Sequence, residues 1–148
     1  MIFLSFCLLI SGCGQEPIIG EIDQNADVAL LRFESFENGI SGVVYRRIQN
    51  FDAFIGVSEV PVLVAFYDPD DPVNSLVIPT LEQMADDGQG LLQIVWINAK
   101  TQTTIAENFS VTRLPQFTVV VGAVLKRSLV GFDDQGQKRL EELIQPYL

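Results

Sequence analysis

Short apolar runs and segments of helical periodicity alternate along the last hundred residues. The run 61–67 (PVLVAFY) is almost continuously apolar, which is typical of a strand covered on both faces of a sheet. Asp71-Pro72 is a favourable helix start, because aspartate accepts a free amide hydrogen bond and proline suits the first turn. The pattern predicts the order β-α-β-α-β-α-β-β-α, with strands at 43–47, 61–67, 91–98, 117–121 and 124–129 and helices at 50–55, 71–87, 104–107 and 134–144. This alternation predicts an α/β protein, a mixed sheet with helices on both faces.

The segment before this alternation carries a hairpin signal of its own. Asn38-Gly39 is the strongest two-residue signal for a tight turn, and apolar residues flank it on both sides. Residues 28–42 are therefore predicted to form an N-terminal strand or hairpin extension, and the main domain is predicted to span 43–148. Residues 13–27 mix Gly, Pro, Gln, Asn and acids without a sustained period, which predicts a flexible tether.

The first ten residues (MIFLSFCLLI) form an apolar run too short to cross a bilayer as a helix. Small residues follow, and Ile10-Ser11-Gly12-Cys13 resembles the lipobox of bacterial lipoprotein signal peptides. The resemblance implies that residues 1–12 are removed as a signal peptide and that Cys13 is acylated, so that the chain is a membrane-anchored lipoprotein of the bacterial cell envelope on the periplasmic side. Gly14 is not the aspartate that marks inner-membrane retention in enterobacterial lipoproteins, which leaves the outer membrane open. Because the run contains no Lys or Arg, two alternatives stay open: an apolar leader that stays uncleaved, and a true start of the chain that lies upstream.

Charge and composition exclude several function classes. Nine Lys and Arg against nineteen Asp and Glu give a net charge of −10, which repels nucleic-acid phosphates. The chain has no His, so His-based catalytic triads and His metal sites are excluded. Its two cysteines are Cys7 and Cys13, so nothing after residue 13 carries a thiol.

The acidic loop before the predicted helix could supply oxygen ligands to a hard cation. Asp68, Asp70, Asp71 and Asn74 lie close together in the sequence, and oxygen donors suit such cations. However, the spacing is not that of an EF-hand, no Glu closes the loop and two prolines restrict the backbone. We therefore expect no metal and no other cofactor, and we expect Asp71 to cap the helix.

Several residues at fixed offsets resemble thioredoxin. Residues 62–67 (VLVAFY) are similar to the strand that leads into the family's active site, and Pro79 falls where the family kinks its long helix. Leu114-Pro115 matches the residue and cis-proline of the family, and Val130-Gly131 matches the end of its hairpin. The resemblance covers about the last hundred residues and implies a thioredoxin-like fold, with a cis bond before Pro115.

The residues that carry thioredoxin chemistry are missing at the matching positions. Asp71-Pro72-Val73-Asn74 stands where the family has Cys-Gly-Pro-Cys, and Ala65 stands where it has a buried aspartate. Disulfide exchange needs a thiolate that attacks a disulfide, so the resemblance implies that the folded domain is not a dithiol oxidoreductase.

Leu114-Pro115 is the place where a family function could remain. In the family, the backbone of the residue before the cis-proline lies open beside the active site, where an extended peptide can pair with it. Leu114, Pro115 and Tyr67 are thus candidate peptide-binding residues, with Pro72, Val73 and Phe132 completing an apolar shelf. The alternative is that Pro115 only shapes the chain and that Tyr67, like Trp96, packs in the core.

Two functions follow from this pattern. The first is a redox-inactive, lipid-anchored thioredoxin-like domain that binds an unknown protein or peptide partner near the cis-proline loop. The second is a thioredoxin-family component of envelope thiol-disulfide metabolism, for which the sequence supplies only the fold.

Overall fold

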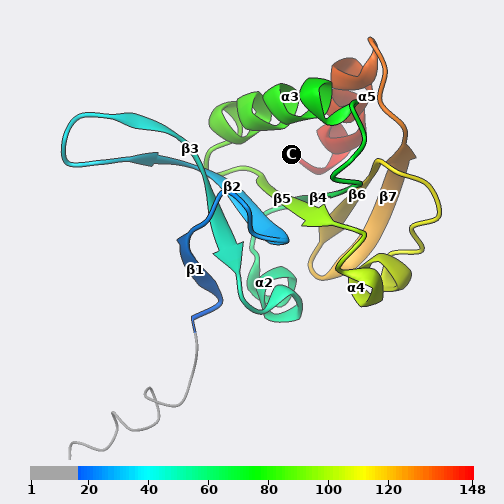
Figure 1. Cartoon of the computed structure of the whole chain (residues 1–148), viewed down its shortest axis with the longest axis horizontal. Helices are drawn as coiled ribbons and strands as arrows, with labels where there is room; N and C mark the ends of the chain where they lie inside the picture. Colours follow the sequence, from blue (N-terminus) through cyan, green and yellow to red (C-terminus); the bar gives the residue numbers. More distant parts are fainter. Residues whose placement is uncertain (1–16) are drawn as a thin grey trace, which may run out of the picture.

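The structure, a computed structural model, describes residues 17–148 as one seven-stranded mixed sheet with helices on both faces (Figure 1). The strand order across the sheet is β1-β3-β2-β5-β4-β6-β7. In chain order the elements are β1 (Ile19–Ile22), β2 (Val28–Ser35), β3 (Ser41–Ile48), α2 (Phe51–Val57), β4 (Val62–Tyr67), α3 (Asn74–Asp87), β5 (Gln93–Asn98), α4 (Thr103–Asn108), β6 (Gln116–Val121), β7 (Val124–Val130), α5 (Gly136–Ile144) and the 3₁₀ turn η1 (Gln145–Tyr147).

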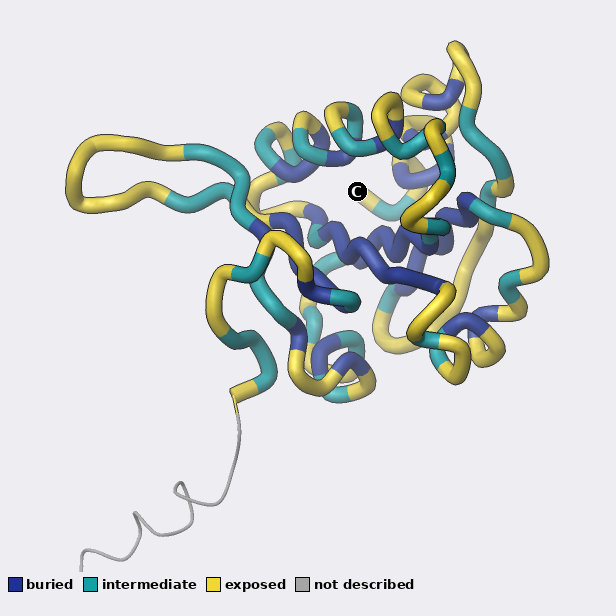
Figure 2. Tube along the Cα trace, in the orientation of Figure 1, coloured by how far each residue is buried: buried dark blue, intermediate teal, exposed yellow. Residues whose placement is uncertain are grey.

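The sheet separates two apolar clusters, each covered by its own helices. Helices α3 and α5 cover one face, where Leu81 and Leu140 are fully buried against the sheet. Helix α2 and the short α4 cover the other face, where Phe54 and Phe66 are buried. The central strands β4 and β5 run through both clusters and form the continuous buried band in Figure 2. Continuously apolar strands are what a sheet covered on both faces requires.

The carboxyl end of β4 and the start of β6 lie side by side. Strand β4 pairs with β5 in parallel and with β6 in antiparallel orientation, and Phe66 is the register partner of Gln116. Residues that follow Tyr67 therefore meet those that precede Gln116. Beyond β6, the Gly122-Ala123 turn that joins β7 has positive φ at both residues, as a tight two-residue hairpin turn requires.

The predicted boundary at residue 43 cuts through one hairpin. Strands β2 and β3 pair from Ala29–Arg47 to Ser35–Ser41, and β2, rather than β3, joins the rest of the sheet. Val28 to Leu31 pair in antiparallel orientation with Ile94 to Ile97 of β5. The side chains of residues 28–31 alternate between the two clusters and are all buried. Part of the predicted extension is thus a core strand, because it supplies apolar side chains to both faces.

The tip of this hairpin also differs from the prediction. A two-residue turn was expected at Asn38-Gly39, but the strands are joined by the longer loop 36–40. The amide of Phe36 donates to the carbonyl of Ile40 at 2.8 Å, and Gly39 takes a φ of +83°. The hairpin projects beyond the sheet as an arm, here defined as residues 32–44 (Figures 1 and 2).

The second half of the predicted tether is part of the sheet. Ile19 to Ile22 form β1, which pairs with Ile48 and Arg46 of β3, and the Gln49 amide donates to the Ile18 carbonyl. The strand forms because Ile18 and Ile19 pack against the cluster under α2, a contact that the polar composition of residues 13–27 conceals. Residues 1–12 and Cys13 lie outside the part of the chain that the structure describes. Within residues 17–148, no helix is long and apolar enough to span a membrane.

Candidate functional site

The site predicted from the sequence begins where β4 ends, in a loop of tight turns. The Asp68 carboxylate accepts a hydrogen bond from the Asp70 amide, and the Asp68 carbonyl accepts one from the Asp71 amide. Oδ1 of Asp71 in turn accepts a hydrogen bond from the Val73 backbone N–H at 3.0 Å. Helix α3 starts three residues later than Asp71, at Asn74. Asp71 therefore holds the turn before the helix, and it is not the N-cap that the sequence predicted, because Pro72 and Val73 form a separate turn first.

Asn74 ties the start of α3 to the end of β4. Its Nδ2 donates to the Asp68 carbonyl at 2.7 Å. Its Oδ1 is buried and makes no hydrogen bond with any residue in 17–148. An amide in this position fixes the loop, but it offers neither a nucleophile nor a proton acceptor of useful basicity.

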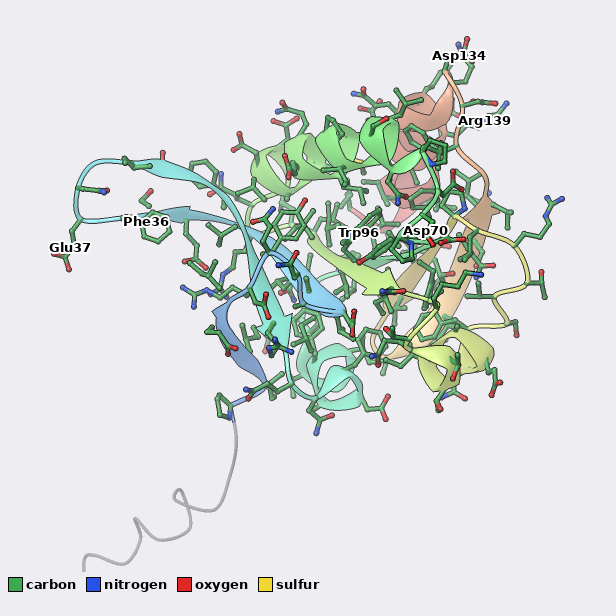
Figure 3. All side chains as sticks on the ribbon, in the orientation of Figure 1. Phe36, Glu37, Asp70, Trp96, Asp134 and Arg139 are labelled. Carbon is green, nitrogen blue, oxygen red and sulfur yellow. The ribbon has the colours of Figure 1, made fainter. Side chains whose placement is uncertain are left out.

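The carboxylates of the loop are engaged separately. Asp68 lies 3.7 Å from the Lys100 ammonium, Asp71 bonds the Val73 amide, and Asp70 is exposed (Figure 3). In residues 17–148, no group of three or more acidic, His or Cys side chains gathers as ligands of a metal ion would. The loop is an acidic surface whose oxygen atoms mainly stabilise its own backbone.

Beside this loop, the Leu114–Pro115 peptide bond is cis, the isomer that the resemblance implies. Pro115 is buried, and its carbonyl accepts a hydrogen bond from the Gly131 amide at 2.8 Å. Neither the N–H nor the C=O of Leu114 is hydrogen-bonded to another described residue. One complete backbone donor and acceptor pair thus remains available beside the start of β6.

Tyr67 is an aromatic platform at the end of β4. Its ring stacks on Trp96, with centroids 3.9 Å apart and planes 6° from parallel. Burial of the ring raises the pKa of the Tyr67 phenol, and the nearby Asp27 carboxylate raises it further. The hydroxyl therefore remains a proton donor at neutral pH. Trp96 is 5% exposed, so its role is in the core, as predicted.

The residues of the predicted shelf are distributed over both faces of the sheet. Tyr67, Val73 and Phe132 pack against the cluster under α3 and α5, whereas Leu114 packs against the cluster under α2 and α4. The Phe132 ring packs directly on Gly136, where a Cβ would come within 2.5 Å of the ring, so only glycine leaves room for it. The core-packing alternative thus describes Tyr67 in part, and only its partly exposed edge is available to a ligand.

Two polar residues that the sequence analysis missed support this end of the sheet. Asn98 is 8% exposed. Its backbone N–H donates to the Asp27 carbonyl at 2.8 Å, and its side-chain Nδ2 donates to the Asp27 carboxylate at 3.3 Å. Asn98 Oδ1 also accepts the Lys100 amide, which places Lys100 beside Asp68. No local signal identifies the Asp27–Asn98 pair, because the two residues are 71 positions apart.

Comparison with known proteins assigns the chain to a family. The thioredoxin family model matches residues 42–145. Thioredoxin 1 of Chlorobaculum tepidum is 32% identical over 95 residues, which cover 64% of this chain and 94% of that protein. The chloroplastic thioredoxin M-type of Zea mays is 24% identical over 95 residues, again 64% of this chain, but this chain spans only 57% of the maize protein.

Solved structures agree on the fold. Oxidised mitochondrial thioredoxin 3 of Saccharomyces cerevisiae superposes with a TM-score of 0.58 at 19% identity, covering 65% of this chain and 86% of that one. The thioredoxin-like fold expected from the sequence is thereby confirmed. By its sequence match and by its fold, the chain belongs to the thioredoxin family.

Proposed function

We propose that this chain is a membrane-anchored, redox-inactive member of the thioredoxin family that binds an extended segment of a partner protein. The observation that carries the proposal is the combination of a sulfur-free α3 start and an unpaired Leu114 backbone next to it. A scaffold with that combination retains a place for a peptide and lacks the groups that would reduce it.

Redox inactivity is supported by the chemistry of the α3 start. No residue after Cys13 is a cysteine, so residues 17–148 contain no thiolate to attack a disulfide. The Asp71 carboxylate is engaged with the Val73 amide, and Asn74 bonds the Asp68 carbonyl. Both side chains act on their own backbone.

Peptide binding is supported by what surrounds Leu114. An extended segment can add to an open backbone through its own N–H and C=O groups, with side chains providing specificity. The protonated Tyr67 hydroxyl and the exposed Asp70 carboxylate lie at the neighbouring end of β4. Together they favour a partner segment with hydrogen-bonding groups over a purely apolar one.

Attachment to a membrane is supported by Ile10-Ser11-Gly12-Cys13, the order that resembles a lipobox. Incorporation of labelled fatty acid in a bacterial host is expected for the natural sequence and not for Cys13→Ala. An unlabelled natural chain that keeps residues 1–12 would contradict this part of the proposal.

The redox part is tested by insulin reduction with the purified chain and its Cys13→Ser variant. We expect both to match the buffer background. Turnover above background that survives in Cys13→Ser would contradict redox inactivity and favour a role in envelope thiol-disulfide metabolism.

The binding part is tested by a photo-crosslinking amino acid at Arg113, which is exposed and precedes Leu114. The matched control carries the same group at Lys126, exposed on β7. We expect crosslinking at 113 only, to one segment of one partner, and we expect a synthetic peptide of that segment to bind the purified chain.

Replacing a backbone-bonding residue of the peptide by proline should weaken binding at least about tenfold, because the lost N–H leaves one group of Leu114 unpaired. A peptide that binds equally well with and without the proline would contradict strand-like pairing.

A further inference from the structure

A shallow apolar groove lies where the described chain begins. Its volume is about 440 Å³, and its apolar lining comes from Ile18, Ile19, Phe54, Val57 and Val60. Val57, at the end of α2, is 64% exposed. The groove is lined by Phe54 and Val57 of α2. Helix α2 is on the opposite face of the sheet from α3 and α5 (Figure 1).

The connection between this groove and Cys13 is short. The Ile18 carbonyl is fixed by the Gln49 amide at 2.8 Å, and Ile19 pairs with Ile48, so the folded domain starts at residue 18. Only the four residues 14–17 separate Cys13 from Ile18. A chain of this length spans at most about 17 Å from Cα to Cα, at about 3.4 Å per residue. A domain of this size has a radius of gyration of about 14 Å, so its far side lies well beyond that reach.

We propose that the groove surface, formed by Ile18, Ile19 and Val57, is the surface that contacts the lipid bilayer. The inference rests on the proposed acylation of Cys13, which would fix that residue at the bilayer surface. Among the other exposed apolar side chains, Ile22 is also on β1, whereas Leu76 is on α3 and Val124 is on β7, at the opposite edge of the sheet. The short connection selects the groove among them.

Charge specifies the kind of membrane surface that fits. The groove lining contains the acidic Glu59 and neither Lys nor Arg, so the surface is apolar with one negative charge. Such a surface suits a zwitterionic interface better than a strongly anionic one. The anchor holds the groove at high effective concentration, so contact by a few apolar side chains is enough to orient the domain.

This orientation keeps the proposed peptide site away from the bilayer. Strand β1 is at one edge of the sheet, and β4 is four strand positions away, a distance of about 19 Å at about 4.8 Å per strand. Asp70, at the end of β4, lies in Figure 3 on the side of the fold away from β1. A membrane-facing groove therefore leaves Leu114 and its surroundings open to partners.

The test uses the natural chain purified from bacterial membranes, with a single cysteine introduced by Val57→Cys. The matched control is Leu76→Cys, a leucine 57% exposed on α3, on the opposite face. Each is labelled with an environment-sensitive fluorophore and reconstituted into vesicles of phosphatidylethanolamine and phosphatidylcholine that contain headgroup-nitroxide lipids. We expect at least about threefold stronger quenching at residue 57 than at residue 76. Equal quenching, or stronger quenching at 76, would overturn the proposal.

The mass of the labelled chain separates this test from the proposed acylation. An acylated and processed chain has no free Cys13 and no Cys7, so it carries one fluorophore. Two or more fluorophores would show that Cys13 is not acylated or that residues 1–12 are not removed, and either result contradicts the proposed membrane attachment itself. One fluorophore with equal quenching at the two positions contradicts only the membrane-facing surface.

Discussion

The two ends of β2 show how position in the sheet, more than residue type, decides what an apolar side chain does. Val28 to Leu31 lie between β3 and β5 and are all buried, with helices over both faces. Past Leu31, β2 no longer pairs with β5, and the same strand continues into the arm. Phe66 in β4 is fully buried, whereas Phe36 at the arm tip is 39% exposed. An apolar residue of β2 is therefore buried only where β2 pairs with β5 and helices cover both faces of the sheet.

The two regions are also stabilised by different forces. The central sheet is stabilised by apolar burial, which salt does not screen. The base of the arm carries an ion-pair cluster in which Glu34 accepts hydrogen bonds from Arg46 at 2.8 Å and from Arg32 at 3.0 Å. These bonds, with the charges of the two guanidinium groups, lower the pKa of Glu34 from 4.5 to about 2. Tyr45 connects the hairpin to α3, since its hydroxyl donates to Glu82 at 2.7 Å.

The strongest test of this comparison removes each part of the hairpin in turn. A chain that starts at residue 43 loses β2 and leaves one edge of β5 unpaired, and we expect it to show no cooperative unfolding transition. A chain in which Asn-Gly replaces residues 34–42 keeps the register pair Phe33–Val43, and we expect it to unfold cooperatively. Thermal melts followed by near-UV circular dichroism and by Trp96 fluorescence measure both. A cooperative transition in the chain that starts at 43 would show that the boundary predicted from the sequence is sufficient for folding.

A single substitution in each part of the hairpin gives the next largest effect. Leu30 is 1% exposed, and we expect Leu30→Ala to lower the free energy of unfolding by about 2–5 kcal/mol, because it leaves a cavity in the core. Phe36→Ala at the arm tip should change it by less than about 0.5 kcal/mol. Urea titrations measure both values. Equal losses at the two positions would mean that the arm is packed as firmly as the sheet.

The smallest expected effect is the pH dependence contributed by Glu34. Because its pKa is lower in the folded state, the ionised carboxylate stabilises the fold above about pH 4.5, and this contribution is lost as the pH falls towards about 2. Glu34→Gln should remove that part of the acid sensitivity, a change below about 1 kcal/mol for a cluster that water can reach. Urea midpoints at pH 6, 3.5 and 2.5 measure it, with Glu37→Gln as the control for net charge. If Glu34→Gln and the natural chain showed identical pH profiles, Glu34 would not contribute to the pH dependence of stability.

The second half of the fold was predictable because its signals are local. The continuous apolar run at 61–67 contains β4, and the strands predicted at 117–121 and 124–129 are β6 and β7, joined by the Gly122-Ala123 turn. In each case neighbouring residues settle the local structure, through the burial of a short run or the positive φ of a turn. The candidate site residues Asp71, Leu114 and Pro115 lie between β4 and β6, in this same half of the chain, so they could be identified from the sequence.

The first half was less predictable because its structure depends on distant partners. Ile18 and Ile19 are too few to signal a strand, and they become one only against Ile48. Nothing near Asp27 indicates that Asn98 will bind it. The late start of α3 has a local cause instead, since Pro72 and Val73 form a separate turn before the helix begins at Asn74.

The position of β2 between β3 and β5 also sets an order of events during synthesis. The β2–β3 hairpin is local and can close within about 1–10 μs once both strands are made. Its partner edge on β5 comes much later, since Asp27 and Asn98 are 71 residues apart. Because chains are made from the N-terminus, the edge of β2 that pairs with β5 stays unpaired while β4 and α3 are synthesised. During that interval it can pair with a foreign strand. Until β5 is available, residues 28–31 are therefore the exposed apolar edge of the β2–β3 hairpin.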